Sequence, residues 1–185
     1  MNNMYLYHHK EISFCGHSGS GKTTLICSII DELNSNYRIG YIKHDAHNFQ
    51  MDKPGKDTYK ARKSGADTVF ISNESEFCFL GNGLISNEII KRVFECFDFI
   101  IVEGHKKTPL PKIITFNEQE DLIKTIDDAN IEGILAFCGK DDFIEPYILE
   151  SFPPHYNTLR SLPYFQRDDI ENISKFILQK IRLQI

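Results

Sequence analysis

The sequence lacks any continuous apolar stretch long enough for a membrane-spanning helix, and its N-terminus shows no charged segment followed by an apolar signal core. Basic residues are not in excess either, because 21 Lys and Arg stand against 26 Asp and Glu, for a formal net charge of −5. This acidic balance argues against a general affinity for nucleic acid or anionic membrane surfaces. We therefore expect a cytoplasmic protein that binds neither nucleic acid nor membranes.

The sequence also lacks any Cys-x-x-Cys pair. The five cysteines are Cys15, Cys27, Cys78, Cys96 and Cys138. Their wide spacing within apolar segments favours reduced thiols in the core over a disulfide framework. Internal repeats and low-complexity tails are absent as well, and 185 residues suffice for one domain with a full core. We expect a single domain over 1–185.

What the sequence does contain is a glycine-rich phosphate-binding pattern, Gly16-His17-Ser18-Gly19-Ser20-Gly21-Lys22-Thr23. The glycines let the backbone turn tightly and bring its N–H groups close to phosphates. Lys22 would place a positive charge on the β- and γ-phosphates, and the Thr23 hydroxyl would ligate a magnesium ion. The pattern predicts a nucleoside triphosphate site formed by Gly16, His17, Ser18, Gly19, Ser20, Gly21, Lys22, Thr23 and Thr24.

The flanking segments supply the strand and the helix that this motif requires. Residues 11–15 alternate polar and apolar side chains, as a strand with one buried face does. From Gly21 onward, apolar residues recur at helical spacing: Leu25, Ile26, Ile29, Ile30 and Leu33. This context disfavours the alternative, a chance glycine- and serine-rich turn.

Further strands and helices alternate along the chain. Apolar patterns predict strands at 37–44, 67–72, 77–80, 99–102, 112–116 and 133–138, and helices at 57–64, 89–97, 118–128 and 168–181. Segment 152–163 shows no clear periodicity. This order predicts a three-layer α/β/α sandwich with a mostly parallel sheet of six or seven strands, whose ligand lies at the carboxyl ends of the strands.

Charged residues follow the second predicted strand, where Lys43 and His44 are followed by His47 and Asp52. They could place charge beside the phosphates, or they could belong to an ordinary solvated loop. The two histidines could also suggest a metal pair, but no third ligand stands at a suitable spacing.

Two carboxylates are candidates for the magnesium site. Glu103 ends the strand at 99–102, whose continuous apolar run is typical of a strand buried on both faces. A carboxylate there can hold magnesium directly or through water, or it can merely cap a neighbouring loop. Asp57 begins a predicted helix, where capping explains its position as well as a place in the outer shell of a metal does.

Four segments together resemble the family of molybdopterin-guanine dinucleotide biosynthesis protein B, small GTP-binding adapters of molybdenum cofactor maturation. They are 16–24; 42–44 followed by 52–59 with Arg62, Gly65 and Ala66; 102–104; and 111–113. The run Asp52-Lys53-Pro54-Gly55-Lys56-Asp57 is the most specific. The chain departs from the family pattern at His105, where the family usually has Phe, and at 117–128, which matches nothing in that pattern.

The resemblance implies a phosphate-loop nucleotide-binding fold over 1–185, with an added antiparallel strand pair at 67–80 that helps two subunits form a homodimer. It implies weak GTP hydrolysis and association with the guanylyltransferase that attaches GMP to molybdopterin. Carried over by position, the roles are phosphate and magnesium binding for 16–24, magnesium binding for Glu103, the metal's outer shell for Asp57, and anion binding for Lys43, Lys106 and, more weakly, His44. The catalytic groups would be Lys22, Asp57 and Glu103.

Two other functions remain open from the residues alone. One is a small-molecule kinase that uses ATP, and the other is a nucleotide-gated metal chaperone that binds its metal at His44 and His47. The choice of base is also open, because Gly139-Lys140-Asp141-Asp142 only partly matches the Asn-Lys-x-Asp pattern of guanine-reading loops. The preference for GTP over ATP therefore follows from the resemblance.

Overall fold

The computed structural model describes residues 10–43, 52–81, 87–140 and 144–182. The chain divides into two compact units, one formed by Met1–His44 with Lys91–Ile185 and the other by Asp45–Ile90. The single domain over 1–185 stays a prediction. No helix in the described part of the chain is long and apolar enough to cross a membrane.

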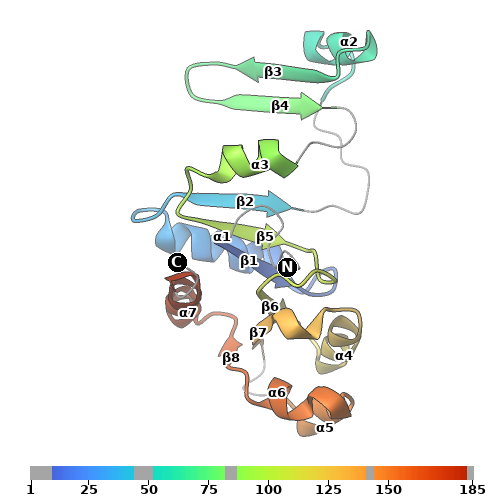
Figure 1. Ribbon diagram of the computed structural model, residues 1–185, viewed down its shortest axis with the longest axis vertical. Helices are drawn as coiled ribbons and strands as arrows, with labels where there is room; N and C mark the ends of the chain where they lie inside the picture. The colour runs from blue at the N-terminus through green and yellow to red at the C-terminus, as the bar shows by residue number, and fades with distance from the viewer. Residues whose placement is uncertain (1–9, 44–51, 82–86, 141–143, 183–185) are drawn as a thin grey trace. The chain divides into compact units, whose positions relative to one another are not determined.

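A six-stranded parallel sheet forms the centre of the first unit (Figure 1). In spatial order its strands are β2 (Ile39–Lys43), β5 (Phe99–Glu103), β1 (Glu11–Cys15), β6 (Lys112–Thr115), β7 (Ile134–Gly139) and β8 (Tyr164–Gln166). Every neighbouring pair runs parallel. The predicted mostly parallel sheet is confirmed.

Helices cover both faces of this sheet. On one face, α1 (Lys22–Leu33) and α7 (Ile170–Arg182) pack against alternate residues of the central strands, including Ile12 and Phe14. On the other face, α4 (Gln119–Asp127), α5 (Pro146–Glu150) and α6 (Tyr156–Arg160) pack around Cys15, Ile114 and Phe137. The result is the predicted three-layer arrangement.

Strand β1 is more deeply buried than its alternating sequence predicts. All five of its residues are buried, including the polar Glu11 and Ser13, because β1 lies between β5 and β6 with helices on both faces. The Ser13 hydroxyl is satisfied by the carbonyl of Gly104 at 2.6 Å. The prediction of a strand with one buried face was therefore wrong.

The second unit contains α2 (Asp57–Lys63) and an antiparallel hairpin of β3 (Thr68–Ser72) and β4 (Phe77–Gly81). Its turn is closed by the Asn73 side chain, whose Oδ1 accepts hydrogen bonds from the backbone N–H groups of Ser75 and Glu76. These elements were predicted, as was α3 (Asn87–Phe94), which runs across the boundary of the two units.

Two groups of expectations need correction. The region without clear periodicity contains the 3₁₀ turn η2 (Pro153–His155) and α6, flanked by α5 and β8, which the sequence patterns did not predict; η1 (Ile131–Gly133) precedes β7. The cysteines differ from the expectation in their burial. All five are free, as expected, but they are not all core residues. Cys15 and Cys138 are buried, Cys78 is half-buried, and Cys27 and Cys96 are exposed.

Candidate nucleotide-binding site

The glycine-rich segment forms a tight turn between β1 and α1. Gly19 and Gly21 have φ angles of 77° and 80°, a left-handed conformation that favours glycine. At Gly16 the constraint is space, since an added Cβ would lie 2.1 Å from the carbonyl oxygen of Thr115. Gly19 and Gly21 thus allow the backbone conformation of the turn, and Gly16 allows the close approach of Thr115.

The ammonium group of Lys22 lies against the backbone of this loop. It donates hydrogen bonds to the carbonyl oxygens of Gly16 at 3.0 Å and His17 at 2.7 Å, and to the Ser20 hydroxyl at 3.3 Å. Burial lowers the pKa of Lys22, while the nearby Glu103 carboxylate acts in the opposite direction. The structure therefore holds a cation within the loop that the sequence predicts to bind phosphates.

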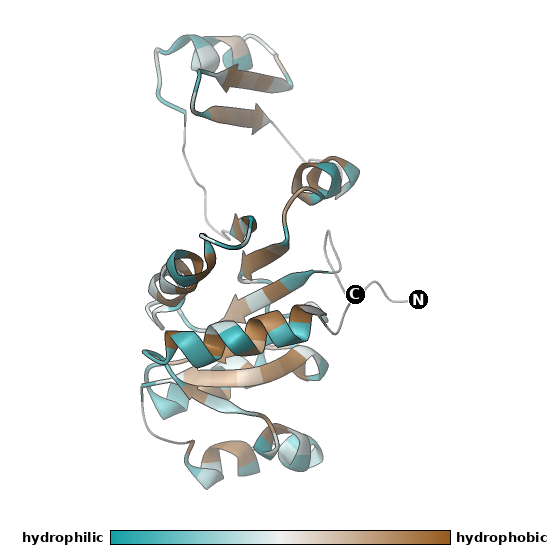
Figure 2. Ribbon diagram, turned by 90° about the vertical axis from the view of Figure 1, so that its left-hand side faces the viewer, coloured by the Kyte–Doolittle hydropathy of each residue, from teal (hydrophilic) through white to brown (hydrophobic). Residues whose placement is uncertain are grey.

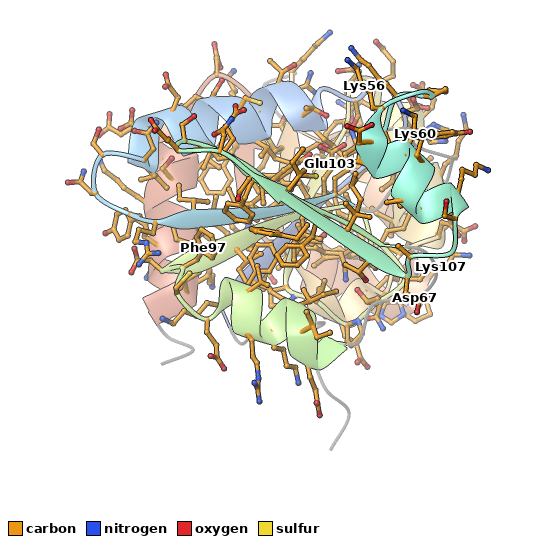
Figure 3. The ribbon with its side chains drawn as sticks, turned by 90° about the horizontal axis from the view of Figure 1, so that it is seen from above. Lys56, Lys60, Asp67, Phe97, Glu103 and Lys107 are labelled. Carbon is orange, nitrogen blue, oxygen red and sulfur yellow. The ribbon has the colours of Figure 1, made fainter. Side chains whose placement is uncertain are left out.

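Glu103, labelled in Figure 3, lies at the carboxyl end of β5 and contacts side chains of α1 and β2. Its Oε2 accepts hydrogen bonds from the Thr23 hydroxyl at 2.9 Å and the Tyr41 hydroxyl at 2.7 Å. Its Oε1 lies 3.2 Å from the Lys43 ammonium. The parallel register brings Lys43 directly opposite Glu103 on the neighbouring strand.

These contacts keep the Glu103 carboxylate charged. Burial by itself raises its pKa, but the hydrogen bonds from Tyr41, Thr23 and Lys43 and the charge of Lys43 outweigh burial, so that the pKa lies below its usual range. Hydroxyl and carboxylate oxygens are ligands that magnesium prefers. Thr23 and Glu103 are therefore the residues here that could hold a magnesium ion.

A second set of contacts supports the loop from β6 and β8. The Ser20 hydroxyl lies 3.1 Å from that of Thr115, and Asn117 donates its side-chain amide to the Gly19 carbonyl at 2.7 Å. Arg167 donates in turn to Asn117 Oδ1 at 2.6 Å and to the Phe116 carbonyl. Its guanidinium also lies against Gly21, since an added Cβ there would be 2.8 Å from Arg167 Nη1.

Four residues of this site were not predicted from the sequence: Tyr41, Thr115, Asn117 and Arg167. Tyr41 could have been found, because it stands two residues before Lys43 and so shares a face of the predicted strand. Thr115 and Asn117 could have been found at the carboxyl end of a predicted strand, where ligands bind in open α/β sheets. Arg167 follows β8, a strand that no pattern predicted, and so had no comparable signal.

Other predicted residues have other partners or lie outside the described chain. Lys106 and Lys107 both form ion pairs with Asp128. Thr24 continues α1 beyond the loop. His44 and His47 lie outside the described residues, as do Asp141 and Asp142.

Asp57 belongs to the second unit, where it is the first residue of α2. The N-cap residue is Lys56 (Figure 3), whose side chain makes no capping hydrogen bond, so Asp57 itself is not the cap. The fully exposed Asp57 carboxylate lies 3.3 Å from the Lys60 ammonium. The outer-shell role of Asp57 stays a prediction.

The segment that follows Glu103 adopts a strained turn. Gly104 has φ 103° and His105 has φ 57°, a left-handed conformation that is uncommon for a residue with a side chain. The Gly104 carbonyl accepts hydrogen bonds from Ser13 and Cys15 of β1. These hydrogen bonds fix the turn to β1 immediately after Glu103, the last residue of β5.

The parallel sheet, the glycine-rich turn between β1 and α1, and the carboxylate at the end of β5 define a phosphate-loop nucleotide-binding fold. The family model described as molybdopterin guanine dinucleotide synthesis protein B, MobB, matches residues 11–138, and the chain belongs to this family.

Known proteins agree with this assignment. The chain is 34% identical over 113 residues to a molybdopterin-guanine dinucleotide biosynthesis adapter protein of Haemophilus influenzae, a match that covers 58% of this chain and 64% of the relative. It is 32% identical over 114 residues to the Escherichia coli protein of the same name, covering 58% and 65%. The chain thus spans just under two thirds of the length of these relatives.

The crystal structure of Bacillus subtilis MobB superposes with a TM-score of 0.70 at 24% identity. The superposition covers 92% of this chain and 97% of that one. At this identity the likeness shows the fold alone, and it extends that fold beyond the residues that the family model matches.

Proposed function

We propose that this protein is a GTP-binding accessory protein in the guanylation of the molybdenum cofactor, where it assists the guanylyltransferase that makes molybdopterin guanine dinucleotide. The observation that supports this most is that Lys22, Thr23 and Glu103 lie close together at the carboxyl ends of the strands, in a chain of the MobB family. The names of the relatives support the role in guanylation of the cofactor, and the contacts within the site support binding of a triphosphate with magnesium.

The phosphates would occupy the turn formed by Gly16–Thr23, where backbone N–H groups and the α1 N-terminus favour anions. The Lys22 ammonium now bonds to loop carbonyls, and phosphate oxygens would be its stronger, charge-assisted partners. Magnesium would be held by Thr23 and Glu103 and would neutralise charge on the phosphates. Lys43 would keep Glu103 oriented through its ion pair.

The surroundings of the loop support slow hydrolysis. Fast phosphoryl transfer commonly uses an arginine that stabilises charge on the transferring group. Arg167 lies beside the loop, but its guanidinium is bonded to Asn117 and the Phe116 carbonyl. An arginine engaged in this way is suited to support the loop, and a protein that assists a partner enzyme needs no rapid turnover.

The hairpin of the second unit supports a homodimer. Phe70, Phe77 and Phe79 share one face of the hairpin, and these residues are 54%, 70% and 60% exposed. Figure 2 shows β3 and β4 as strongly hydrophobic. A two-stranded hairpin is marginally stable alone, and burial of this apolar face against a second copy would stabilise it.

Reconstituted guanylation tests the proposal. GMP transfer to molybdopterin by a purified guanylyltransferase is measured with no addition, with this protein, and with its Lys22→Ala variant. We expect the wild-type protein to raise product formation and Lys22→Ala to lose that effect, because the variant lacks the charge that the triphosphate requires. Lys124→Ala, which removes an exposed lysine on α4, is the matched control and should behave as wild type.

Two outcomes would contradict the proposal. Equal product formation with and without the protein would remove the accessory role. Rapid triphosphate consumption that depends on a small-molecule acceptor, with ATP as donor, would instead support the kinase.

A further inference from the structure

A hollow of about 420 Å³ lies beside the phosphate loop in the first unit. This volume falls within the usual range of ligand pockets, roughly 300–1,000 Å³. Thr24 and Leu25 line it from the first turn of α1, directly after Thr23. A triphosphate held by the loop would therefore have its nucleoside end within reach of this hollow.

The opposite wall comes from the ends of two paired strands. Lys140 follows β7 and Arg167 follows β8, and the Arg167 N–H donates to the Gly139 carbonyl at 2.8 Å. Arg167 is also the residue that lies against Gly21 of the loop. One arginine thus borders both the phosphate loop and the hollow, which makes them parts of one continuous site.

The lining suits a purine base. Leu25 and Ile170 provide apolar surface for the faces of the ring, and the aliphatic part of Lys140 can add to it. Asp168 is the only carboxylate among the residues that line the hollow within the described chain. Its side chain has no hydrogen-bond or ion-pair partner among the described residues, so both carboxylate oxygens are available to a ligand.

The chemistry of a carboxylate distinguishes the two common purines. Guanine presents two adjacent donors, its N1–H and its N2 amino group, which match the two acceptor oxygens of an ionised Asp. Adenine presents an acceptor at N1, which a carboxylate would repel. We infer that the hollow binds the base of the nucleotide and that Asp168 selects guanine; this rests on the triphosphate site proposed above.

A change of preferred base tests this inference. In the Asp168→Asn variant the amide can donate to the C2 oxygen of xanthine, which replaces the amino group of guanine. Binding of Mg-GTP, Mg-XTP (xanthosine triphosphate) and Mg-ATP is measured by calorimetry. We expect Asp168→Asn to weaken Mg-GTP binding by about tenfold to a hundredfold and to bind Mg-XTP more tightly than wild type does.

The neighbouring Asp169→Asn variant is the matched control. Asp169 accepts hydrogen bonds from Asn172 at the start of α7 and does not line the hollow, so this variant should keep the wild-type order of affinities. Wild-type affinity for Mg-GTP in Asp168→Asn would overturn the inference while leaving the triphosphate site intact. If the wild-type protein binds none of the three nucleotides, the inference and the proposed function both fail.

Discussion

At the scale of the residue, Glu103 connects the phosphate loop to the sheet. Its carboxylate joins Thr23 of α1 to Tyr41 and Lys43 of β2, and this set of partners keeps it ionised. The position of Glu103 could be predicted, because a buried apolar strand ends there. Its partner Tyr41 was not predicted, because Tyr41 lies two residues before the end of its strand and only residues at strand ends were expected to line the site.

Replacement of Glu103 by Gln tests its role toward magnesium. The variant keeps the size of the side chain but removes the charge that would attract the metal. We expect GTP affinity to fall by about tenfold or more with magnesium and to change little without it. Titrations in magnesium and in a chelator provide the comparison, with the exposed Glu132→Gln as the control. Equal losses under both conditions would argue against a metal role.

Lys112 is a second residue whose burial has a measurable effect. Its side chain is completely buried, and its ammonium donates to the carbonyl oxygens of Thr108 at 2.7 Å and Asn130 at 3.2 Å. Burial lowers the pKa of Lys112 from 10.5 to about 8. Below pH 8 the folded protein therefore bears the cost of a buried charge that the unfolded chain does not.

This cost should disappear as the pH rises. Between about pH 8 and 10.5 the unfolded chain binds more protons at this position than the folded protein, so Lys112 adds up to about 3 kcal/mol to the free energy of unfolding. The raised thiol pKa values of Cys15 and Cys138 act in the opposite direction. The readout is therefore the difference between urea unfolding of wild type and of Lys112→Met across this pH range. Parallel pH profiles would contradict the prediction.

At the scale of the element, the β3–β4 hairpin has an apolar surface that its own strands cannot bury. Cross-strand pairing places Phe70 opposite Phe79, with ring centroids 4.7 Å apart, and Phe77 lies on the same face. Large exposed apolar surfaces of this kind mark contact sites in many proteins. The proposed homodimer would use this surface.

We expect Phe79→Ser to convert a wild-type dimer into a monomer, because the variant loses apolar area at the centre of the hairpin face. Sedimentation equilibrium at micromolar protein concentration measures the change. Tyr147→Ser removes another exposed aromatic residue, on α5, and should leave the dimer intact. A wild-type protein that sediments as a monomer at these concentrations would argue against the dimer.

The elements that could be predicted are those with a strong period or a complete motif. Continuous apolar residues predicted β5, and the glycine-rich pattern with its flanking segments predicted β1 and α1. The elements α5, α6 and β8 have five residues or fewer, too short for a period to emerge. Because β8 was not predicted, Arg167 and Asp168, which directly follow it, were not predicted as residues of the site.

At the scale of the whole molecule, the chain divides into two compact units. The first unit contains the phosphate loop, Glu103 and the hollow lined by Asp168. The second contains the hairpin and the run from Asp52 to Asp57, in which Asp52 pairs with Arg62 at 3.2 Å. This ion pair joins the run from Asp52 to Asp57 to Arg62 on α2.

The most direct test of the central claim is a calorimetric titration of the purified protein with GTP and with ATP, each with and without magnesium. We expect saturable binding of Mg-GTP that is tighter than binding of Mg-ATP, that weakens when magnesium is removed, and that is lost in Lys22→Ala. Absence of binding in wild type, or equal affinity of wild type and Lys22→Ala for Mg-GTP, would contradict the proposed nucleotide site.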